Sequence, residues 1–340
     1  MNKMTAPKPA DQAALRTLAG DITVKVEQAM HGDLQRALVG NDPLLAEVLE
    51  YALFSGGKRI RPLLAVLSSR ICGRNDETLY LLAAAFEYLH VATLIHDDVI
   101  DHADQRRGKE SVGSKYGMAA AILAGDWLHA RSMYLIGSLT GVGGLEIFSE
   151  ATTAMVDGEF LQLRHTENVT VNEQDYFAVI NKKTARLIGS TCEIGAFYAG
   201  ADEKRQKALA TYGDRVGIAF QVVDDLLDYL GDQQTTGKKV GNDFIEGKIT
   251  LPLLHALSRA DGQDKKILIE LIQGNRNHSS AYETVHRIME KLGGFDTAEK
   301  TAQKLVHEAI AALDVFAGCR DTESYAMLSG LAGYILARNK

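Results

Sequence analysis

The sequence predicts an all-α fold, a single-domain bundle of about a dozen helices. Apolar residues recur at intervals of three and four positions along most of the chain, which is the spacing of one helix face. Only five of the 340 residues are prolines, and proline breaks helix interiors. No stretch alternates apolar and polar residues as a half-buried strand would, and the hydrophobic content of 46% suffices for a sizeable core.

The expected helices follow one another with glycine-rich or polar breaks between them. In chain order they span 13–38, 44–55, 62–72, 77–103, 117–139, 145–163, 173–198, 203–230, 250–260, 264–273, 281–292, 296–317 and 322–338. Breaks are expected at 56–57, 73, 141–144, 168–172, 231–247, 274–280 and 293–294. Asn75-Asp76 and Asn172 are typical helix caps. No low-complexity linker divides the chain, so we expect a flexible tail over 1–12 and one domain over 13–340.

Charge and cysteine content exclude several classes of protein. The 37 Lys and Arg against 44 Asp and Glu give a formal charge of -7, which argues against a nucleic-acid partner. Three widely spaced cysteines indicate a reducing compartment rather than a disulfide scaffold. The N-terminus lacks the apolar region of a signal peptide, and no run of 18 apolar residues occurs. We therefore expect a cytoplasmic protein without stable membrane insertion.

Two acidic clusters share the pattern Asp-Asp-x-x-Asp within apolar helical sequence. They are Asp97, Asp98 and Asp101, and Asp224, Asp225 and Asp228. The first and fifth positions of such a pattern lie about 40° apart on a helix, so their carboxylates share one face. Like charges in an apolar setting need neutralising, and hard carboxylate oxygens suit Mg²⁺. One such cluster fits a solvated helix end equally well, but two copies favour metal binding.

Basic residues gather where a diphosphate could bind. Gly56-Gly57-Lys58-Arg59-Ile60-Arg61-Pro62 is a glycine turn with three cations that opens onto a helix. Further cations occur at Arg106, Arg107, Lys109, Lys182, Lys183, Lys238, Lys239 and Lys248. Each basic group alone is more typical of a solvated face. Only in combination with the acidic clusters does it indicate a diphosphate site. His90, two helical turns before Asp97, and His96 fit either a packed core histidine or a site residue.

These motifs together resemble those of the trans-isoprenyl diphosphate synthases, and most of all the long-chain, octaprenyl-type members. The matching pieces are GGKRIRP at 56–62, HVATLIHDDVIDHADQRRGKESV at 90–112, KKTA at 182–185, QVVDDLLDYLGD at 221–232 and GNDFIEGKITLPL at 241–253. The resemblance implies Mg²⁺-dependent, head-to-tail condensation of isopentenyl diphosphate onto an allylic prenyl diphosphate. It also implies an all-α bundle around a central cavity, a homodimer and an all-trans polyprenyl product used for quinone side chains.

The resemblance also implies roles for individual residues. Asp97 and Asp101 would hold two Mg²⁺ ions with support from Asp98, and Asp224 would hold a third, with Asp225 and Asp228 around it. The isopentenyl diphosphate site would consist of Lys58, Arg61, His90 and Arg107. The allylic diphosphate site would consist of Arg106, Lys183, Thr184, Gln221, Lys238 and Lys248. Product length would depend on Ala92 and Thr93, which are small, with Phe86 further back as a limit on depth.

Four alternatives remain open. A short-chain farnesyl or geranylgeranyl diphosphate synthase is disfavoured by the small residues at 92 and 93. A non-catalytic subunit of a heteromeric synthase would be expected to have lost an acidic motif. A metal phosphohydrolase built on His96 and Asp97 leaves the second acidic cluster unexplained. A terpene cyclase typically replaces the second cluster with an Asn/Ser/Glu pattern.

Overall fold

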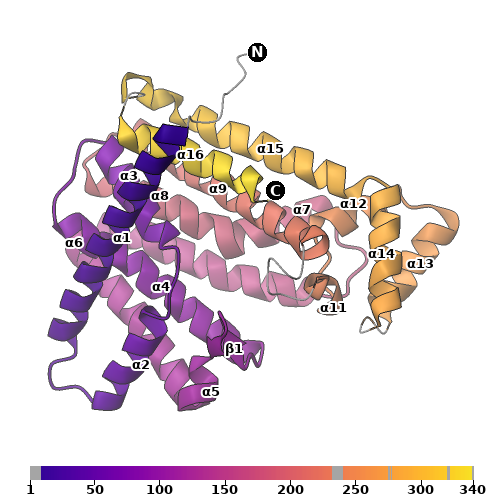
Figure 1. Cartoon of the computed structure of the whole chain (residues 1–340), viewed down its shortest axis with the longest axis horizontal. Coiled ribbons are helices and arrows are strands. Elements are labelled where there is room, and N and C mark those ends of the chain that lie inside the picture. Colours follow the sequence, from indigo (N-terminus) through magenta and orange to yellow (C-terminus); the bar gives the residue numbers. More distant parts are fainter. Residues whose placement is uncertain (1–8, 232–239, 275, 277, 320–321, 339–340) are drawn as a thin grey trace. The chain divides into compact units, whose positions relative to one another are not determined.

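The chain folds into α-helices, which confirms the predicted class (Figure 1). The computed structural model describes residues 9–231, 240–274, 276, 278–319 and 322–338. The chain divides into two compact units, each described separately below. Unit 1 comprises residues 1–149, 191–206 and 318–328, and unit 2 comprises 150–190, 207–317 and 329–340. The expected single domain over 13–340 therefore stays a prediction, and the expected tail lies mostly outside the described residues.

Unit 1 is built around helix α4. Its elements are α1 (Pro9–Ala37), α2 (Pro43–Leu53), α3 (Ile60–Ile71), α4 (Thr78–Ile100), β1 (Gln105–Arg106), β2 (Lys109–Glu110), α5 (Val112–Tyr116), the first part of α6 (Met118–His165) and the second part of α8 (Arg186–Tyr198). α4 contacts α1, α2, α3 and α5, and most of its residues are buried. The fully buried ring of Phe86 meets Phe148 of α6 edge to face, with ring centroids 5.9 Å apart. α4 thus forms the core of unit 1 and carries the first acidic cluster at its C-terminal end.

By length and composition, α4 could also cross a membrane. Its mean hydropathy reaches 1.5 over an 18-residue window, and 72% of that window is buried inside the protein. A core helix passes the same test as a spanning helix, because both are rich in apolar residues. Burial by the surrounding helices accounts for the composition of α4, and the expectation of no stable membrane insertion stays a prediction.

A short hairpin and helix, which the periodicity analysis missed, follow α4. Gln105 pairs with Glu110 and Arg106 with Lys109 across β1 and β2. The two loop residues, Arg107 and Gly108, both have positive φ, at 53° and 75°. Positive φ at both central positions is the requirement of a type I′ hairpin turn. Periodicity over so few residues carries no signal, so only the tertiary structure reveals this hairpin.

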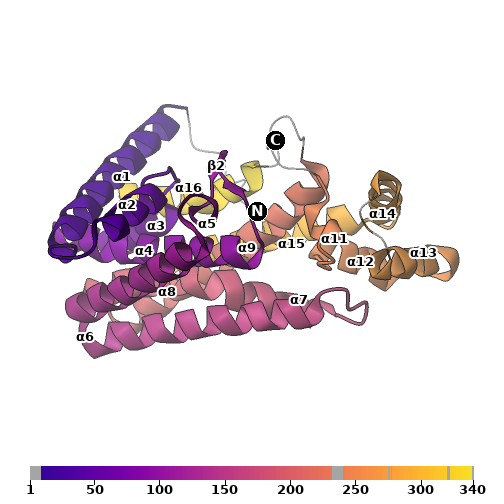
Figure 2. The same cartoon turned by 90° about the horizontal axis from the view of Figure 1, so that it is seen from below.

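Unit 2 contains the remaining helices. They are the second part of α6, α7 (Glu173–Ile180), η1 (Asn181–Ala185), most of α9 (Glu203–Leu230), α11 (Asn242–Ile245), α12 (Leu251–Arg259), α13 (Gly262–Gln273), α14 (Ser279–Lys291), α15 (Gly294–Ala312), η2 (Leu313–Cys319) and the end of α16 (Glu323–Ala337). α12 packs on α14 and α15, and α13 lies beside α14 (Figures 1 and 2). Lys291 of α14 bonds Asp264 of α13 at 2.7 Å. Helices α14 and α15 therefore cover α12, and α13 packs on α14.

Most expected helices match observed ones, and the main exceptions are α11, which lies inside the break expected over 231–247, and a π-helical turn inside the helix expected over 173–198. The break expected at 141–144 occurs inside α6 at Gly141, whose φ of 69° and ψ of -161° are not helical. The helix expected over 173–198 is instead divided into α7 and α8 by the π-helical turn η1. A capping box between Asn172 and Asp175 begins α7, as the cap residue predicted.

Candidate active site

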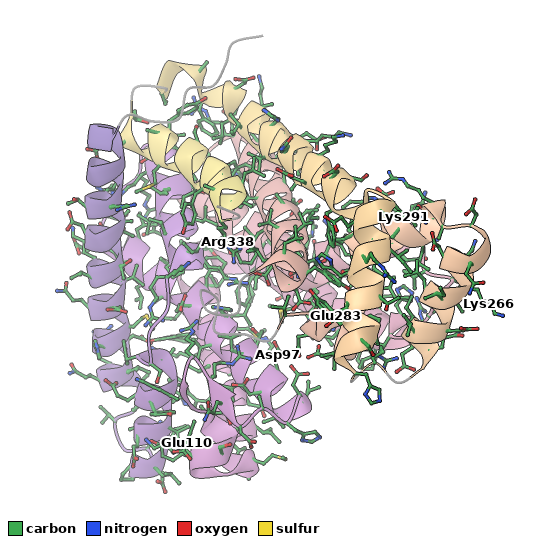
Figure 3. All side chains as sticks on the ribbon, turned by 45° about the vertical axis from the view of Figure 1, so that its right-hand side comes forward. Asp97, Glu110, Lys266, Glu283, Lys291 and Arg338 are labelled. Carbon is green, nitrogen blue, oxygen red and sulfur yellow. The ribbon has the colours of Figure 1, made fainter. Side chains whose placement is uncertain are left out.

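The first acidic cluster ends helix α4. Asp98 is buried and pairs with Arg106 of the hairpin, whose Nε donates to both carboxylate oxygens at 2.7 and 2.8 Å and whose Nη2 lies 2.6 Å from Oδ1. Asp97, labelled in Figure 3, is half-buried on the preceding position. Asp101 is exposed at the helix end, where its backbone N–H donates to the carbonyl of Asp97 at 2.8 Å. Asp98 therefore has a protein cation of its own, and Asp101 lies exposed where the helix ends.

The predicted isopentenyl diphosphate residues form a cationic group in unit 1. Lys58 is exposed, and Arg61 is half-buried with a buried Nε that has no hydrogen-bond partner among the described residues. Burial is the main cause that holds the pKa of His90 well below its usual range, and the positive charges of Arg61 and Arg107 act in the same direction. His90 thus stays neutral at pH 7 in a field of arginine charge. Such a surplus of positive charge favours the binding of an anion.

The hairpin brings Arg107 back onto the glycine turn. Its Nη1 donates to the carbonyl of Gly56. A Cβ added at Gly57 would lie 3.0 Å from the same nitrogen, so glycine is what allows this guanidinium so close to the backbone. The segment 56–62 and the hairpin, far apart in sequence, thereby meet in one cationic surface.

The middle cation of the glycine turn has a structural function. Arg59 is buried, with Nη1 2.7 Å from Glu87 of α4, Nη2 3.0 Å from Glu27 of α1 and 2.7 Å from the carbonyl of Leu53. Its backbone is left-handed, with φ 48° and ψ 37°, although it is not a glycine. The buried ion pairs offset the cost of that conformation, which is about 1–2 kcal/mol. Arg59 therefore anchors the turn that carries Lys58 and Arg61.

The second acidic cluster lies on α9 in unit 2, and each of its carboxylates has a different environment. Asp224 is half-exposed and accepts a hydrogen bond from Arg338 Nη2 at 3.1 Å. Arg338, labelled in Figure 3, follows the last turn of α16 and stacks on Phe220 at 4.5 Å. The contact joins positions 114 residues apart, so no sequence pattern could have pointed to Arg338.

Asp225 and Asp228 are held by the protein itself. Asp225 is buried and accepts hydrogen bonds from Tyr176 Oη at 2.6 Å and Gln221 Nε2 at 2.8 Å. Burial, together with the charge of Asp243, raises the pKa of Asp225 well above its usual range. Asp228 accepts from the backbone N–H groups of Asn242 and Asp243 at 3.2 and 3.0 Å. It thereby caps the N-terminus of α11, whose own cap residue is a glycine.

The predicted allylic diphosphate residues of unit 2 come together around a cavity of about 140 Å³. Its polar lining includes Lys183, Thr184, Gln221, Lys248, Asp225 and Asp243. Thr184 Oγ1 lies 3.4 Å from Gln221 Oε1, and Lys183 Nζ bonds Glu159 of α6 at 2.8 Å. Lys248 Nζ pairs with Glu246 at 2.5 Å. Lys238 lies outside the described residues, and Arg106 lies in unit 1 on Asp98.

Asp243 is a site residue that the sequence analysis did not single out, although it stands inside the matched segment 241–253. Burial is the main cause that raises the pKa of Asp243 to about 7, and the negative charge of Asp228 is the second. Crowded carboxylates with raised pKa values indicate a deficit of positive charge, which a bound cation relieves. Within the described residues, no three His, Cys, Asp or Glu side chains already lie together as a metal site. Mg²⁺ typically takes one or two carboxylates with waters and substrate phosphates, so these donors fit it.

The chain-length candidates lie on α4 before the first cluster. Ala92 is buried, and Thr93 is half-buried with its hydroxyl donating to the carbonyl of His90 at 2.8 Å. Tyr88 points to α1, where its hydroxyl donates to Asp33 at 3.2 Å. His96 packs its ring over Gly125, where a Cβ would lie 2.2 Å from Nε2. His96 of α4 is thus packed against α6.

The chain is all-α, and cationic side chains lie in each unit that carries an Asp-Asp-x-x-Asp cluster, a combination that resembles enzymes acting on diphosphates. The sequence model of the polyprenyl synthetase family matches residues 42–291. The chain belongs to this family, and it is a prenyl diphosphate synthase, an enzyme that transfers prenyl groups.

Relatives of known name cover nearly the whole chain. The octaprenyl diphosphate synthase of Escherichia coli (strain K12) is 36% identical over 321 residues, which are 94% of this chain and 98% of that protein. The geranylgeranyl diphosphate synthase of Sulfolobus acidocaldarius is 32% identical over 93% of this chain and 97% of its own length. The crystal structure of polyprenyl synthase from Caulobacter crescentus CB15, complexed with calcium and isoprenyl diphosphate, superposes with a TM-score of 0.86. It is 33% identical, over 96% of this chain and 97% of that one.

Proposed function

We propose that the protein condenses isopentenyl diphosphate head to tail onto an allylic prenyl diphosphate and makes a long-chain, all-trans polyprenyl diphosphate. One observation carries the proposal: each unit pairs an acidic cluster with separate anion-binding side chains. In unit 1, Asp97 and Asp101 accompany Arg61, whose Nε is buried without a partner. In unit 2, Asp225 of the second cluster lines the same cavity as Lys183 and Lys248. One such group in each unit would suit an enzyme that binds two diphosphate substrates together with divalent cations.

The isopentenyl diphosphate is assigned to the cationic group of unit 1. Lys58 and Arg107 offer exposed charges, Arg61 an unpaired donor, and neutral His90 a hydrogen bond without further charge. Arginine suits this task because its planar fork matches phosphate oxygens. The bound substrate would present its double bond to the allylic carbon.

Mg²⁺ is the cofactor we assign, about three ions per active site, with Asp97, Asp101 and Asp224 as the carboxylates that would hold it. When bound, it neutralises the diphosphate that leaves the allylic carbon. Asp224 also pairs with Arg338, while Asp98 pairs with Arg106 and Asp225 accepts a hydrogen bond from Tyr176. Such second partners orient the carboxylates that bind metal, and their loss weakens metal sites about 10–100-fold.

The protein residues assist each stage of the proposed reaction. Lys183, Lys248 and Lys238 would hold the allylic diphosphate while its C–O bond breaks. The double bond of isopentenyl diphosphate then attacks the allylic cation, and a proton is lost from the new chain to the released diphosphate. No protein base is needed for this step. Apolar helix faces protect the cation from water, which would otherwise capture it.

For the product, we propose octaprenyl diphosphate, destined for a quinone side chain. The side chains of Ala92 and Thr93 are too small to stop elongation there, and Phe86, earlier on α4, would limit the depth. The alternative is a short-chain product, and relatives of comparable similarity bear both kinds of name. The other alternative, a non-catalytic subunit, conflicts with two complete acidic clusters.

We further propose a homodimer acting in the cytoplasm. Helix α6 exposes several large apolar side chains, whereas a solvated helix face is usually polar. They are Met118, Ile122, Leu123, Tyr134, Val156, Phe160 and Leu163. Light scattering coupled to size exclusion tests the dimer, and a monomeric mass at assay concentration would exclude it.

The test of function is an elongation assay. Purified protein is incubated with isopentenyl diphosphate, Mg²⁺ and either a geranyl or a farnesyl diphosphate starter, and the products are identified by mass spectrometry. We expect a ladder that ends near eight isoprene units. A ladder ending at three or four units would establish the short-chain alternative. No elongation with either starter would refute the proposed function.

A further inference from the structure

The turn that carries Lys183 and Thr184 is π-helical. η1 spans Asn181–Ala185 between α7 and α8, where the sequence periodicity predicts an unbroken helix. π-Helical turns are rare and occur frequently at functional sites, because they shift the direction of side chains relative to a regular helix. Such a turn needs support from its surroundings to persist.

Gly158 of α6 supports the turn from one side. A Cβ at position 158 would lie 2.6 Å from the backbone nitrogen of Lys183 and 2.9 Å from its Cα. Both are backbone atoms, so no side-chain rotation could relieve the clash. Only glycine permits α6 to approach the turn this closely.

Gly217 of α9 supports the turn from another side. A Cβ at position 217 would lie 2.6 Å from the Cα of Ala185 and 3.0 Å from its Cβ. Both glycines are buried. The π-helical turn is therefore in contact with two helices at positions where neither helix has a side chain.

The residues next to these glycines hold the side chains of the turn. Asp157 and Glu159 flank Gly158, and they pair with Lys182 and Lys183. One helical turn after Gly217, Gln221 lies 3.4 Å from the hydroxyl of Thr184 and 2.8 Å from Asp225. The two glycine contacts thus set where Lys183 and Thr184 stand relative to the second acidic cluster and to the cavity that they line.

We propose that Gly158 and Gly217 are positioning residues for the allylic diphosphate. They fix the π-helical turn so that Lys183 and Thr184 bind that diphosphate, and they play no such part for isopentenyl diphosphate. This inference rests on the proposed function, since it assigns the contents of the same site.

The test replaces each glycine with alanine. Gly158→Ala and Gly217→Ala are compared with Gly333→Ala, a control on α16 where a Cβ would meet nothing within 4 Å. We measure kcat and the KM of both substrates. A displacement of about 1 Å in a positioning element costs up to about 100-fold, so we expect the KM for the allylic substrate to rise at least about 10-fold. The KM for isopentenyl diphosphate should stay within about twofold of wild type in all three variants.

Equal rises in both KM values, or loss of thermal stability with unchanged KM values, would overturn the inference and leave the glycines a purely structural role. Activity of the wild type is measured first, so a failure of the proposed function is seen separately. A second measurement covers variants that do not fold. In the wild type, inorganic diphosphate with Mg²⁺ should slow hydrogen exchange in peptides covering 181–185. Unchanged exchange there at saturating diphosphate would also overturn the inference.

Discussion

The buried guanidinium of Arg59 makes the sharpest prediction about stability. Arg59→Met would remove a side chain that is 1% exposed and would leave Glu87, 3% exposed, without its direct partner. Breaking a buried ion pair in this way costs about 3–5 kcal/mol, because one charge stays buried and uncompensated. The nearby charge of Arg61 compensates Glu87 in part. The second partner, Glu27, is 38% exposed and adds little. We therefore expect a loss near the lower limit, about 3 kcal/mol.

Thermal and urea denaturation followed by circular dichroism measure this loss. With about 2.1 cal/mol/K of unfolding entropy per residue, 3 kcal/mol corresponds to about 4 °C if the whole chain unfolds together. If unit 1 unfolds by itself, the same loss corresponds to about 8 °C in its own transition. The number of unfolding transitions therefore also tests the single-domain prediction, since a single domain should unfold in one transition. Because Arg59 anchors the turn with Lys58 and Arg61, the KM for isopentenyl diphosphate should rise as well.

Two variants control the experiment. Arg36→Met, at an exposed arginine of α1, should change stability by no more than about 0.5 kcal/mol. The double variant Arg59→Met/Glu87→Gln should recover part of the loss, since it removes the buried charge. A loss below about 1 kcal/mol in Arg59→Met, or strictly additive losses in the double variant, would refute this reasoning.

Three further predictions concern the site. Asp97→Ala and Asp224→Ala should each lower turnover at least about 100-fold with an unchanged far-UV spectrum, because each removes a proposed metal ligand; wild-type rates in both would remove these residues from the mechanism. Ala92→Phe should shorten the product ladder measured by mass spectrometry, and an unchanged ladder would show that position 92 does not limit elongation. His90 has a depressed pKa, so its stabilising effect is present above about pH 6.5 and is lost as the pH falls below that value. His90→Gln should therefore weaken the acid dependence of the melting temperature below about pH 6.5, and an identical dependence in both proteins would contradict the burial of the neutral ring.

The sequence alone determined the helical class, most helix positions and the two acidic clusters. Helix periodicity reports the face that a helix buries, and it requires only local sequence. The break over 141–144 and the cap residue Asn172 were equally local predictions, and the structure has both. The order of GGKRIRP and the two clusters pointed to the family because those residue types are chemically required together.

The tertiary structure decided which members of these motifs are held by the protein. Within one motif, Arg59 is buried on Glu87 while Arg61 keeps an unpaired donor, although their residue types are the same. Likewise Asp228 caps α11, whereas Asp224 accepts a hydrogen bond from Arg338 near the C-terminal end of the chain. Spacing along a helix gives the direction of a side chain but not its partner. The partner depends on long-range packing. Gly158 and Gly217 contribute to that packing because the absence of a side chain lets their helices approach the turn at 181–185.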